Sequence, residues 1–198
     1  MTSGERPLYG NYTELYERAK PYLDTRQNDV HTGVVYGFAL RLLEKYPAAD
    51  EAVVLPAVIL HDVGWKMIPE DQQVKAFGPK MKDADLRRIH EVEGVRIAGE
   101  ILAAAGYDAA RRAEILAIID GHDSREMALS LNDQLMKDSD KLWRFTRTAV
   151  EIDHRRFGME LREHLTWLGQ QIESWLFTPE ARLIAHATFA ESQAALLG

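Results

Sequence analysis

Apolar residues recur along most of the chain at intervals of three and four positions, the spacing that places them on one face of an α-helix. Val30, Val34 and Phe38 follow this pattern within residues 29–46, where Asn28 or Asp29 is expected to cap the helix. Residues 49–63 are more uniformly apolar and predict a buried helix. Further helices are predicted over residues 83–106, 108–121, 132–150, 151–177 and from 178 onward, with Asp83, Asp108 and Thr178 as expected caps.

Helix-breaking residues gather in one segment between the predicted helices. Residues 64–82 contain Gly64, Pro69, Gly78 and Pro79 and predict mostly loop. The alternation of apolar and polar residues that is typical of strands is not found, and no internal repeat divides the chain. A length of 198 residues is enough for one compact domain with its own core. We therefore predict an all-α fold, a single compact domain of about seven to nine helices over residues 1–198.

Composition narrows the classes of partner. No apolar run reaches the roughly 18 to 20 residues of a membrane span, and the first residues contain no apolar core of a secretory signal. The absence of cysteine excludes disulfides, thiolate zinc sites and cysteine nucleophiles, and it fits a cytoplasmic protein. A net charge of -7 with no basic run longer than two residues argues against a nucleic-acid polymer as partner. We expect a cytoplasmic protein with a small anionic substrate and no membrane partner; a homo-oligomer stays open.

Histidine is the residue type with an informative distribution. The chain has seven histidines, and the first four, His31, His61, His90 and His122, recur about every thirty residues on or at the end of different predicted helices. His61 is followed directly by Asp62 at the end of the apolar segment, and burying both groups without partners costs a few kcal/mol. A metal ion would satisfy both, because imidazole and carboxylate are expected ligands of zinc, manganese and iron.

One further carboxylate belongs to this pattern. Asp140 lies within the predicted helix 132–150, among the apolar residues Leu135, Met136, Leu142 and Trp143. His154, His164 and His186 are expected to have ordinary structural roles.

The order of these residues resembles the His…His-Asp…Asp motif of the HD-domain superfamily. The matching residues are His31, His61-Asp62 and Asp140, and the resemblance spans about residues 28–145, with residues 146–198 as a C-terminal helical extension. Three sequence contexts support it: His61-Asp62-Val63-Gly64, His90-Glu91-Val92-Glu93-Gly94 and Lys137-Asp138-Ser139-Asp140-Lys141.

The resemblance also implies a set of metal ligands. In two-metal members, two further histidines lie between the His-Asp pair and the final aspartate, where this chain has His90 and His122. By resemblance, the first ion would be held by His31, His61, Asp62 and Asp140. Asp62 would bridge to a second ion held by His90 and His122, with Asp123 as a spare ligand or an ordinary helix-end residue. We expect two divalent ions, and the sequence does not distinguish Fe, Mn, Zn, Co, Ni and Mg.

The metal set and the usual activity of the superfamily imply a phosphohydrolase. It would act on a nucleotide or other small phosphate ester through a metal-activated water, with His61 and Asp62 at the catalytic centre. Substrate anchoring needs cations near the metals. Arg125, three residues beyond His122, is the first candidate and Lys66 the second, followed by Lys141 and Arg144.

Other functions remain open on this evidence. The ligand pattern also resembles that of the diiron oxygenases of the superfamily, which cleave C–C or C–P bonds with dioxygen. A third alternative is a non-enzymatic binding protein. The absence of a Gly-Tyr-Pro signature counts against a cyclic-di-GMP phosphodiesterase. Residues 65–80 are expected either to cover the site or to serve as a simple connector.

Overall fold

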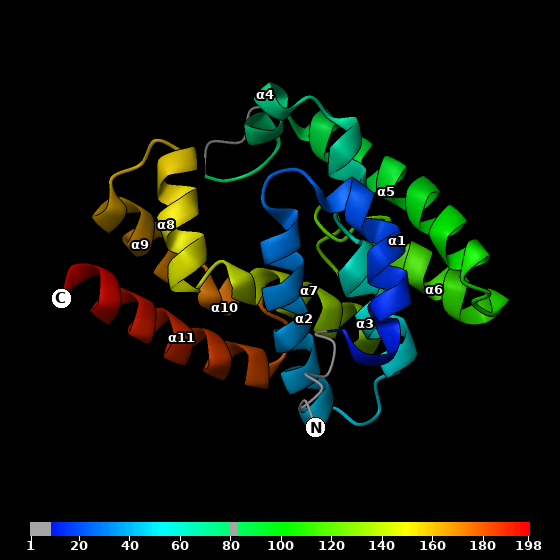
Figure 1. Ribbon diagram of the computed structural model, residues 1–198. Helices are drawn as coiled ribbons and strands as arrows, with labels where there is room; N and C mark the ends of the chain where they lie inside the picture. The colour runs from blue at the N-terminus through cyan, green and yellow to red at the C-terminus, as the bar shows by residue number, and fades with distance from the viewer. Residues whose placement is uncertain (1–8, 80–82) are drawn as a thin grey trace, which may run out of the picture.

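The computed structural model describes residues 9–79 and 83–198, and all regular structure in these residues is helical (Figure 1). The prediction of an all-α fold is therefore confirmed. The longer helices are α1 (Thr13–Leu23), α2 (Asn28–Lys45), α3 (Glu51–Leu60), α5 (Ala84–Ala104), α6 (Ala109–Ile119), α7 (Leu131–Trp143), α8 (Arg147–Arg156), α9 (Leu161–Gly169) and α11 (Pro179–Leu197). Short elements are α4 (Glu70–Gln73), α10 (Ile172–Trp175) and the 3-10 helices η1 (Gly10–Tyr12), η2 (Val63–Met67) and η3 (Val74–Ala76).

Three predicted helix starts match the structure. The side chains of Asp83, Asp108 and Thr178 each accept hydrogen bonds from backbone N–H groups of the first turn that follows. The prediction of Asn28 or Asp29 as a cap is wrong, because α2 begins at Asn28 and follows Gln27, whose backbone is left-handed. The Asn28 amide instead donates to the backbone oxygen of Asp62, at 3.5 Å.

Three segments differ from the predicted pattern of helices and loops. Thr146 ends the predicted helix 132–150, since its hydroxyl accepts from the N–H of Ala149 and caps α8. Gly158, with a φ of 60°, interrupts the predicted helix 151–177. Residues 64–79 form η2, α4 and η3 around the buried side chains of Trp65 and Phe77 rather than an open loop. Residues 80–82 of the expected loop lie outside the described residues.

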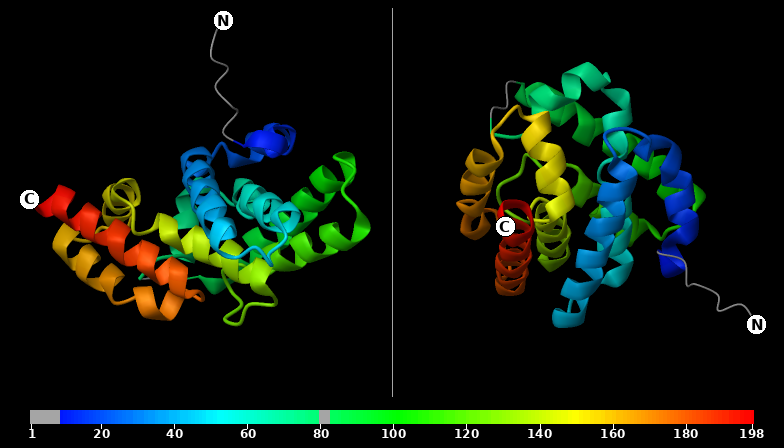
Figure 2. Two further views of the ribbon diagram at one scale, coloured as in Figure 1. Left: turned by 90° about the horizontal axis from the view of Figure 1, so that it is seen from below. Right: turned by 60° about the vertical axis from the view of Figure 1, so that its left-hand side comes forward.

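Helix α3 lies at the centre of the fold. It packs against α2, α6 and α7, and its residues from Val53 to Leu60 are buried, as predicted for the apolar segment. The hairpin of α5 and α6 lies at one end of the molecule and helices α8 to α11 lie at the other (Figure 2). No single helix in the described residues is both long enough and apolar enough to cross a membrane.

The C-terminal helices are tied to α7 at a buried carboxylate. Asp138 accepts hydrogen bonds from the backbone N–H groups of Phe177 and Thr178, at 2.7 and 2.9 Å, and from the Thr178 hydroxyl at 2.6 Å. Asp140 lies two residues further along the same helix. The start of α11 is therefore fixed directly to the helix that positions Asp140.

Candidate metal centre

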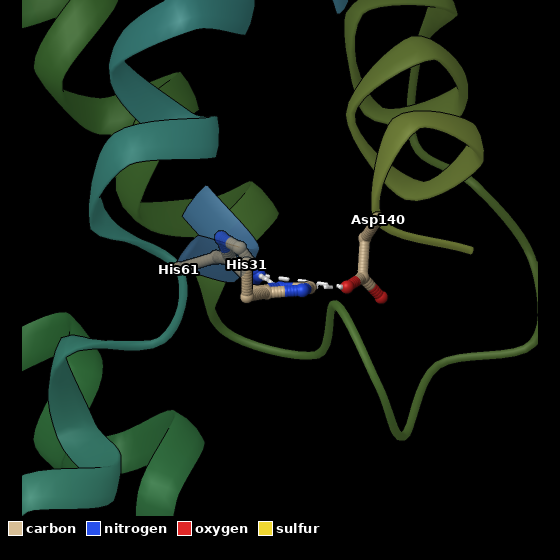
Figure 3. Close-up of side chains that lie close together, drawn as sticks. All are labelled: His31, His61 and Asp140. Atoms are coloured by element: carbon tan, nitrogen blue, oxygen red, sulfur yellow. Dashed lines mark hydrogen bonds and ion pairs between the residues drawn. The ribbon is translucent and has the colours of Figure 1, made fainter. Parts of the chain in front are cut away.

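The candidate ligands come from separate helices and meet at one buried place. His31 lies in the first turn of α2, His61 directly follows α3, and Asp140 lies on α7. Figure 3 shows the side chains of these three residues pointing toward one another. All three are buried, as are Asp62, His90 and His122. His154, His164 and His186 belong to none of the metal-ligand groups found in the described residues.

The first group of donors has the spacing of ligands around one ion. His31 Nε2 lies 3.1 Å from His61 Nε2 and 3.3 Å from Asp140 Oδ1. His61 Nε2 lies 3.6 Å from the same Asp140 oxygen, and Asp62 Oδ2 lies 3.5 Å from His31 Nε2. Donor atoms about 2.1 Å from a common ion are separated by roughly 3.0 to 3.4 Å. The residues present therefore fit a divalent ion with little rearrangement.

A second group adjoins the first. His90 Nε2 lies 3.3 Å from His122 Nε2, and Asp123 Oδ2 lies 3.7 Å from both nitrogens. Asp62 Oδ1 lies 3.6 Å from His61 Nε2 and 3.7 Å from His122 Nε2. Asp62 thus faces both groups, and Asp123, a spare ligand by sequence, belongs to the second.

The histidine hydrogen bonds favour metal ligation through Nε2. His61 Nδ1 donates to the backbone oxygen of Val58 at 2.8 Å, and His122 Nδ1 donates to that of Ile119 at 3.0 Å. Each acceptor is a carbonyl, so the proton of a neutral ring must lie on Nδ1. The lone pair of each Nε2 is then directed into the cluster, as in metal sites where the second ring nitrogen is held by a backbone carbonyl.

The electrostatics of the cluster favour a cation at its centre. Burial lowers the pKa of His122, but the nearby carboxylates of Asp123 and Asp62 outweigh this effect and raise it to about 9. Burial raises the pKa of Asp62, but His61, His122 and His31 hold it well below its usual range. Asp62 is therefore ionised, and the carboxylates stabilise positive charge between them, which a bound divalent ion would supply.

Two supporting residues were not predicted from the sequence. Glu91 is fully buried and accepts from the N–H groups of Asp123 and Ser124, at 3.0 and 2.8 Å, so it holds the turn that follows His122. Trp65 Nε1 donates to Asp62 Oδ1 at 3.0 Å, and its ring stacks on His90 at 4.0 Å. Of these two residues, only Glu91 has a signal in the sequence. It directly follows His90, just as Asp62 directly follows His61.

Arg125 and Lys66, the two cations ranked first for substrate anchoring, are held by other parts of the chain. Arg125 donates to the backbone oxygens of Asp120 and Ala117 and to Asp133. Lys66 donates to the backbone oxygen of Asp24. Within the described residues, a narrow cavity opens beside the ligand cluster, and neither Arg125 nor Lys66 lines it.

The two lower-ranked cations lie at the site itself. Lys141 Nζ contacts Asp123 at 2.8 Å and Asp140 at 2.9 Å. Arg144 lines the cavity beside the cluster and pairs with Asp153 at 2.8 Å. Lys141 and Arg144, which the sequence ranked below Arg125 and Lys66, therefore lie closer to the candidate metal ligands.

A narrow cavity opens beside the ligand cluster. Its volume is about 30 Å³, which is room for only a few water molecules. Polar metal-ligand side chains and three arginines line it together with aromatic rings: Arg26, Asn28, His31, Asp62, Trp65, Phe77, Asp123, Asp140, Trp143, Arg144, Ile152 and Arg156. An adjoining cavity of about 270 Å³ shares Phe77, Asp123 and Arg144 with the first and is also lined by Trp167 and Trp175.

Comparison with known proteins agrees with this geometry. The model of the HD domain family matches residues 29–144, a stretch that contains all of the candidate metal ligands. Searches of curated proteins and of solved structures found no match. Since the family match covers more than half of the 198 residues, this chain belongs to the HD domain family.

Proposed function

We propose that the protein is a metal-dependent phosphohydrolase that acts on a nucleotide or another small phosphate ester. HD domains bind divalent metals and belong to a superfamily of metal-dependent hydrolases. The observation that carries the proposal is the convergence of four histidines and three aspartates on one buried cluster that borders a cavity lined by arginines. A metal cluster beside guanidinium groups suits a substrate with a negatively charged phosphoryl group.

The ligand assignment in this proposal follows the two groups of donors. One ion would be held by His31, His61, Asp62 and Asp140, and the other by Asp62, His90, His122 and Asp123. When bound, the ions would supply Lewis-acid activation of water near neutral pH and charge stabilisation of the phosphoryl group. The nitrogen and oxygen donors suit Fe, Mn, Zn, Co or Ni, whereas Mg would favour more oxygen ligands.

Residues of the chain orient this centre and shape its surroundings. The Trp65 N–H fixes one oxygen of Asp62, and Lys141 holds the carboxylates of Asp123 and Asp140 in place. The narrow cavity is large enough only for the phosphoryl end of a substrate. The adjoining cavity beside Trp167 and Trp175 has room for the organic part.

Phosphate release tests this proposal. Protein loaded separately with Mn, Fe, Co, Zn or Mg is incubated with a panel of nucleotides and small phosphate esters, and free phosphate is measured. We expect turnover of at least one ester that disappears after treatment with a chelator and returns when the metal is added back. Folded, metal-loaded protein that releases no phosphate from any ester would count against the proposal.

The same donors also favour a second candidate function, an oxygenase with an iron pair. Four histidines and adjacent carboxylates provide ligands for two irons as readily as for two zinc or manganese ions. Measuring turnover with and without dioxygen distinguishes the two functions. A phosphohydrolase keeps its full turnover in anaerobic solution and consumes no oxygen, whereas an oxygenase loses turnover without oxygen and contains iron as purified.

A further inference from the structure

The Arg26 guanidinium group packs against two aromatic rings, and some of its buried N–H donors have no acceptor in the described part of the chain. Its guanidinium carbon lies 3.9 Å from the centre of the Trp65 ring and 4.1 Å from that of Phe77. Its Nε and Nη1 atoms are buried and have no hydrogen-bond partner within residues 9–79 and 83–198. Burial lowers the pKa of Arg26 only to about 10, so it is charged at neutral pH. Buried cationic donors without acceptors are costly, which indicates that an acceptor is missing from this place.

The direction of the missing acceptor follows from the shape of the guanidinium group. The ring centres of Trp65 and Phe77 are 6.0 Å apart, so the two rings lie on adjacent sides of the guanidinium group and leave its other sides open. Because the N–H donors of a guanidinium lie in its own plane, an acceptor on an open side would bind along an edge, in the paired arrangement that suits two oxygens of a carboxylate or phosphate. Arg26 lines the same cavity as His31, Asp62 and Asp140. An anion on its edge would lie beside the metal centre.

The backbone that carries Arg26 is strained and firmly held. Arg26 and Gln27 have φ values of 55° and 61°, in the left-handed region that costs roughly 1 kcal/mol or more for a residue other than glycine. Three long-range contacts hold this loop: Lys66 Nζ to the Asp24 oxygen, Gln73 Nε2 to Thr25 Oγ1, and Arg156 Nη2 to the Arg26 oxygen. Strained backbone that the surrounding structure enforces tends to occur where a side chain must be presented to a ligand.

Two further arginines, Arg144 and Arg156, line the cavity together with Arg26. Their guanidinium carbons lie 5.5 and 5.6 Å from the centre of the Phe77 ring. Both pair with the same carboxylate, Asp153, at 2.8 and 3.2 Å. Arg144 and Arg156 thus share one carboxylate partner, whereas Arg26 pairs with no carboxylate in residues 9–79 and 83–198. The carboxylates in the lining, Asp62, Asp123 and Asp140, are candidate metal ligands, and bound divalent ions would offset their charge.

We propose that Arg26, supported by Arg144 and Arg156, binds two oxygens of a phosphate or phosphonate dianion whose phosphorus faces the metal centre. This subsite rests on the proposed function, because it defines the group that the centre would act on. Arg26 and Arg156 lie outside the residues 29–144 matched by the family model. Two of the three arginines of the subsite therefore come from segments that flank the matched domain.

Inorganic phosphate is the direct probe of this subsite. Its affinity for the metal-loaded protein is measured by titration calorimetry for the wild type and for Arg26→Gln, with metal content determined for each. We expect Arg26→Gln to keep its metal and to lose about 10- to 100-fold in phosphate affinity, the worth of a charged hydrogen-bond pair. Arg26→Lys keeps the charge but not the paired donors, and it serves as a second variant if Arg26→Gln does not fold. We expect it to lose less affinity.

The matched control changes an arginine away from the cavity. Arg96 is exposed on α5 and pairs with Glu93 and Glu100, so Arg96→Gln should bind phosphate like the wild type. Unchanged phosphate affinity in both Arg26 variants, or no phosphate binding by the wild type, would overturn the subsite. If phosphate binding depends on Arg26 but no ester is hydrolysed, the subsite stands and the phosphohydrolase proposal fails. If Arg26→Gln hydrolyses esters with the KM of the wild type, the phosphohydrolase proposal stands and the subsite is wrong.

Discussion

An Asp62→Asn variant is expected to lose about 10³-fold or more in turnover and to retain fewer metal ions than the wild type. Asp62 Oδ2 lies 3.5 Å from His31 Nε2, and Oδ1 lies 3.7 Å from His122 Nε2, so its two oxygens face the two groups of donors. Asparagine has nearly the same shape but no charge and only one acceptor oxygen. It cannot serve both groups. Loss of an ion removes several kcal/mol of charge stabilisation, which corresponds to the expected change in rate.

Two measurements on the same preparation check this result. Elemental analysis gives the metal content per chain, and phosphate release gives the turnover. Asp71→Asn is the matched control, because it makes the same chemical change at an exposed position on α4. An Asp62→Asn protein with the metal content and turnover of the wild type would show that Asp62 is not a shared ligand.

Gly64→Ala is expected to destabilise the protein by about 3 kcal/mol. A Cβ at this position would overlap the backbone oxygen of His90 and would lie 2.5 Å from the backbone nitrogen of Gly94. Both contacts are backbone atoms of α5, which cannot move aside without shifting the helix. Since α5 carries His90, the substitution is also expected to separate His90 from His122 and weaken the second group of metal ligands.

Urea unfolding monitored by circular dichroism measures this effect as a shift in the midpoint. Gly37→Ala is the control, because Gly37 lies within α2 and an added Cβ would meet no atom within 4 Å. That control should be stabilised by about 0.5 to 1 kcal/mol, since glycine weakens a helix interior relative to alanine. A Gly64→Ala protein that unfolds at the midpoint of the wild type would contradict the close contact of η2 with α5.

The parts of the site that could be predicted are those with a local signal. His61 and Asp62 end an apolar segment, and the helix caps Asp83, Asp108 and Thr178 precede regular apolar patterns. Residue type and order along the chain were enough to select these positions. The breaks at Thr146 and Gly158 were missed because a capping hydroxyl and a left-handed glycine each outweigh a continuing helical pattern.

The anchoring cations could not be predicted in the same way. Arg125 follows His122 closely in sequence, but its guanidinium is held by Asp133 and two backbone oxygens. Arg26 precedes α2 in a loop with no periodic pattern, and its position depends on contacts from residues as distant as Arg156. Distance along the chain does not determine where a long side chain points, and tertiary contacts decide it.

The most direct test of the metal centre is anomalous X-ray diffraction from crystals of the manganese-loaded protein. Two peaks are predicted in the buried cluster. One should lie among His31, His61, Asp62 and Asp140, and the other should lie beside His90, His122 and Asp123. A single peak would contradict the role of Asp62 as a shared ligand. If manganese is found only elsewhere on the protein, with none in the cluster, the account of this site as a metal centre is wrong.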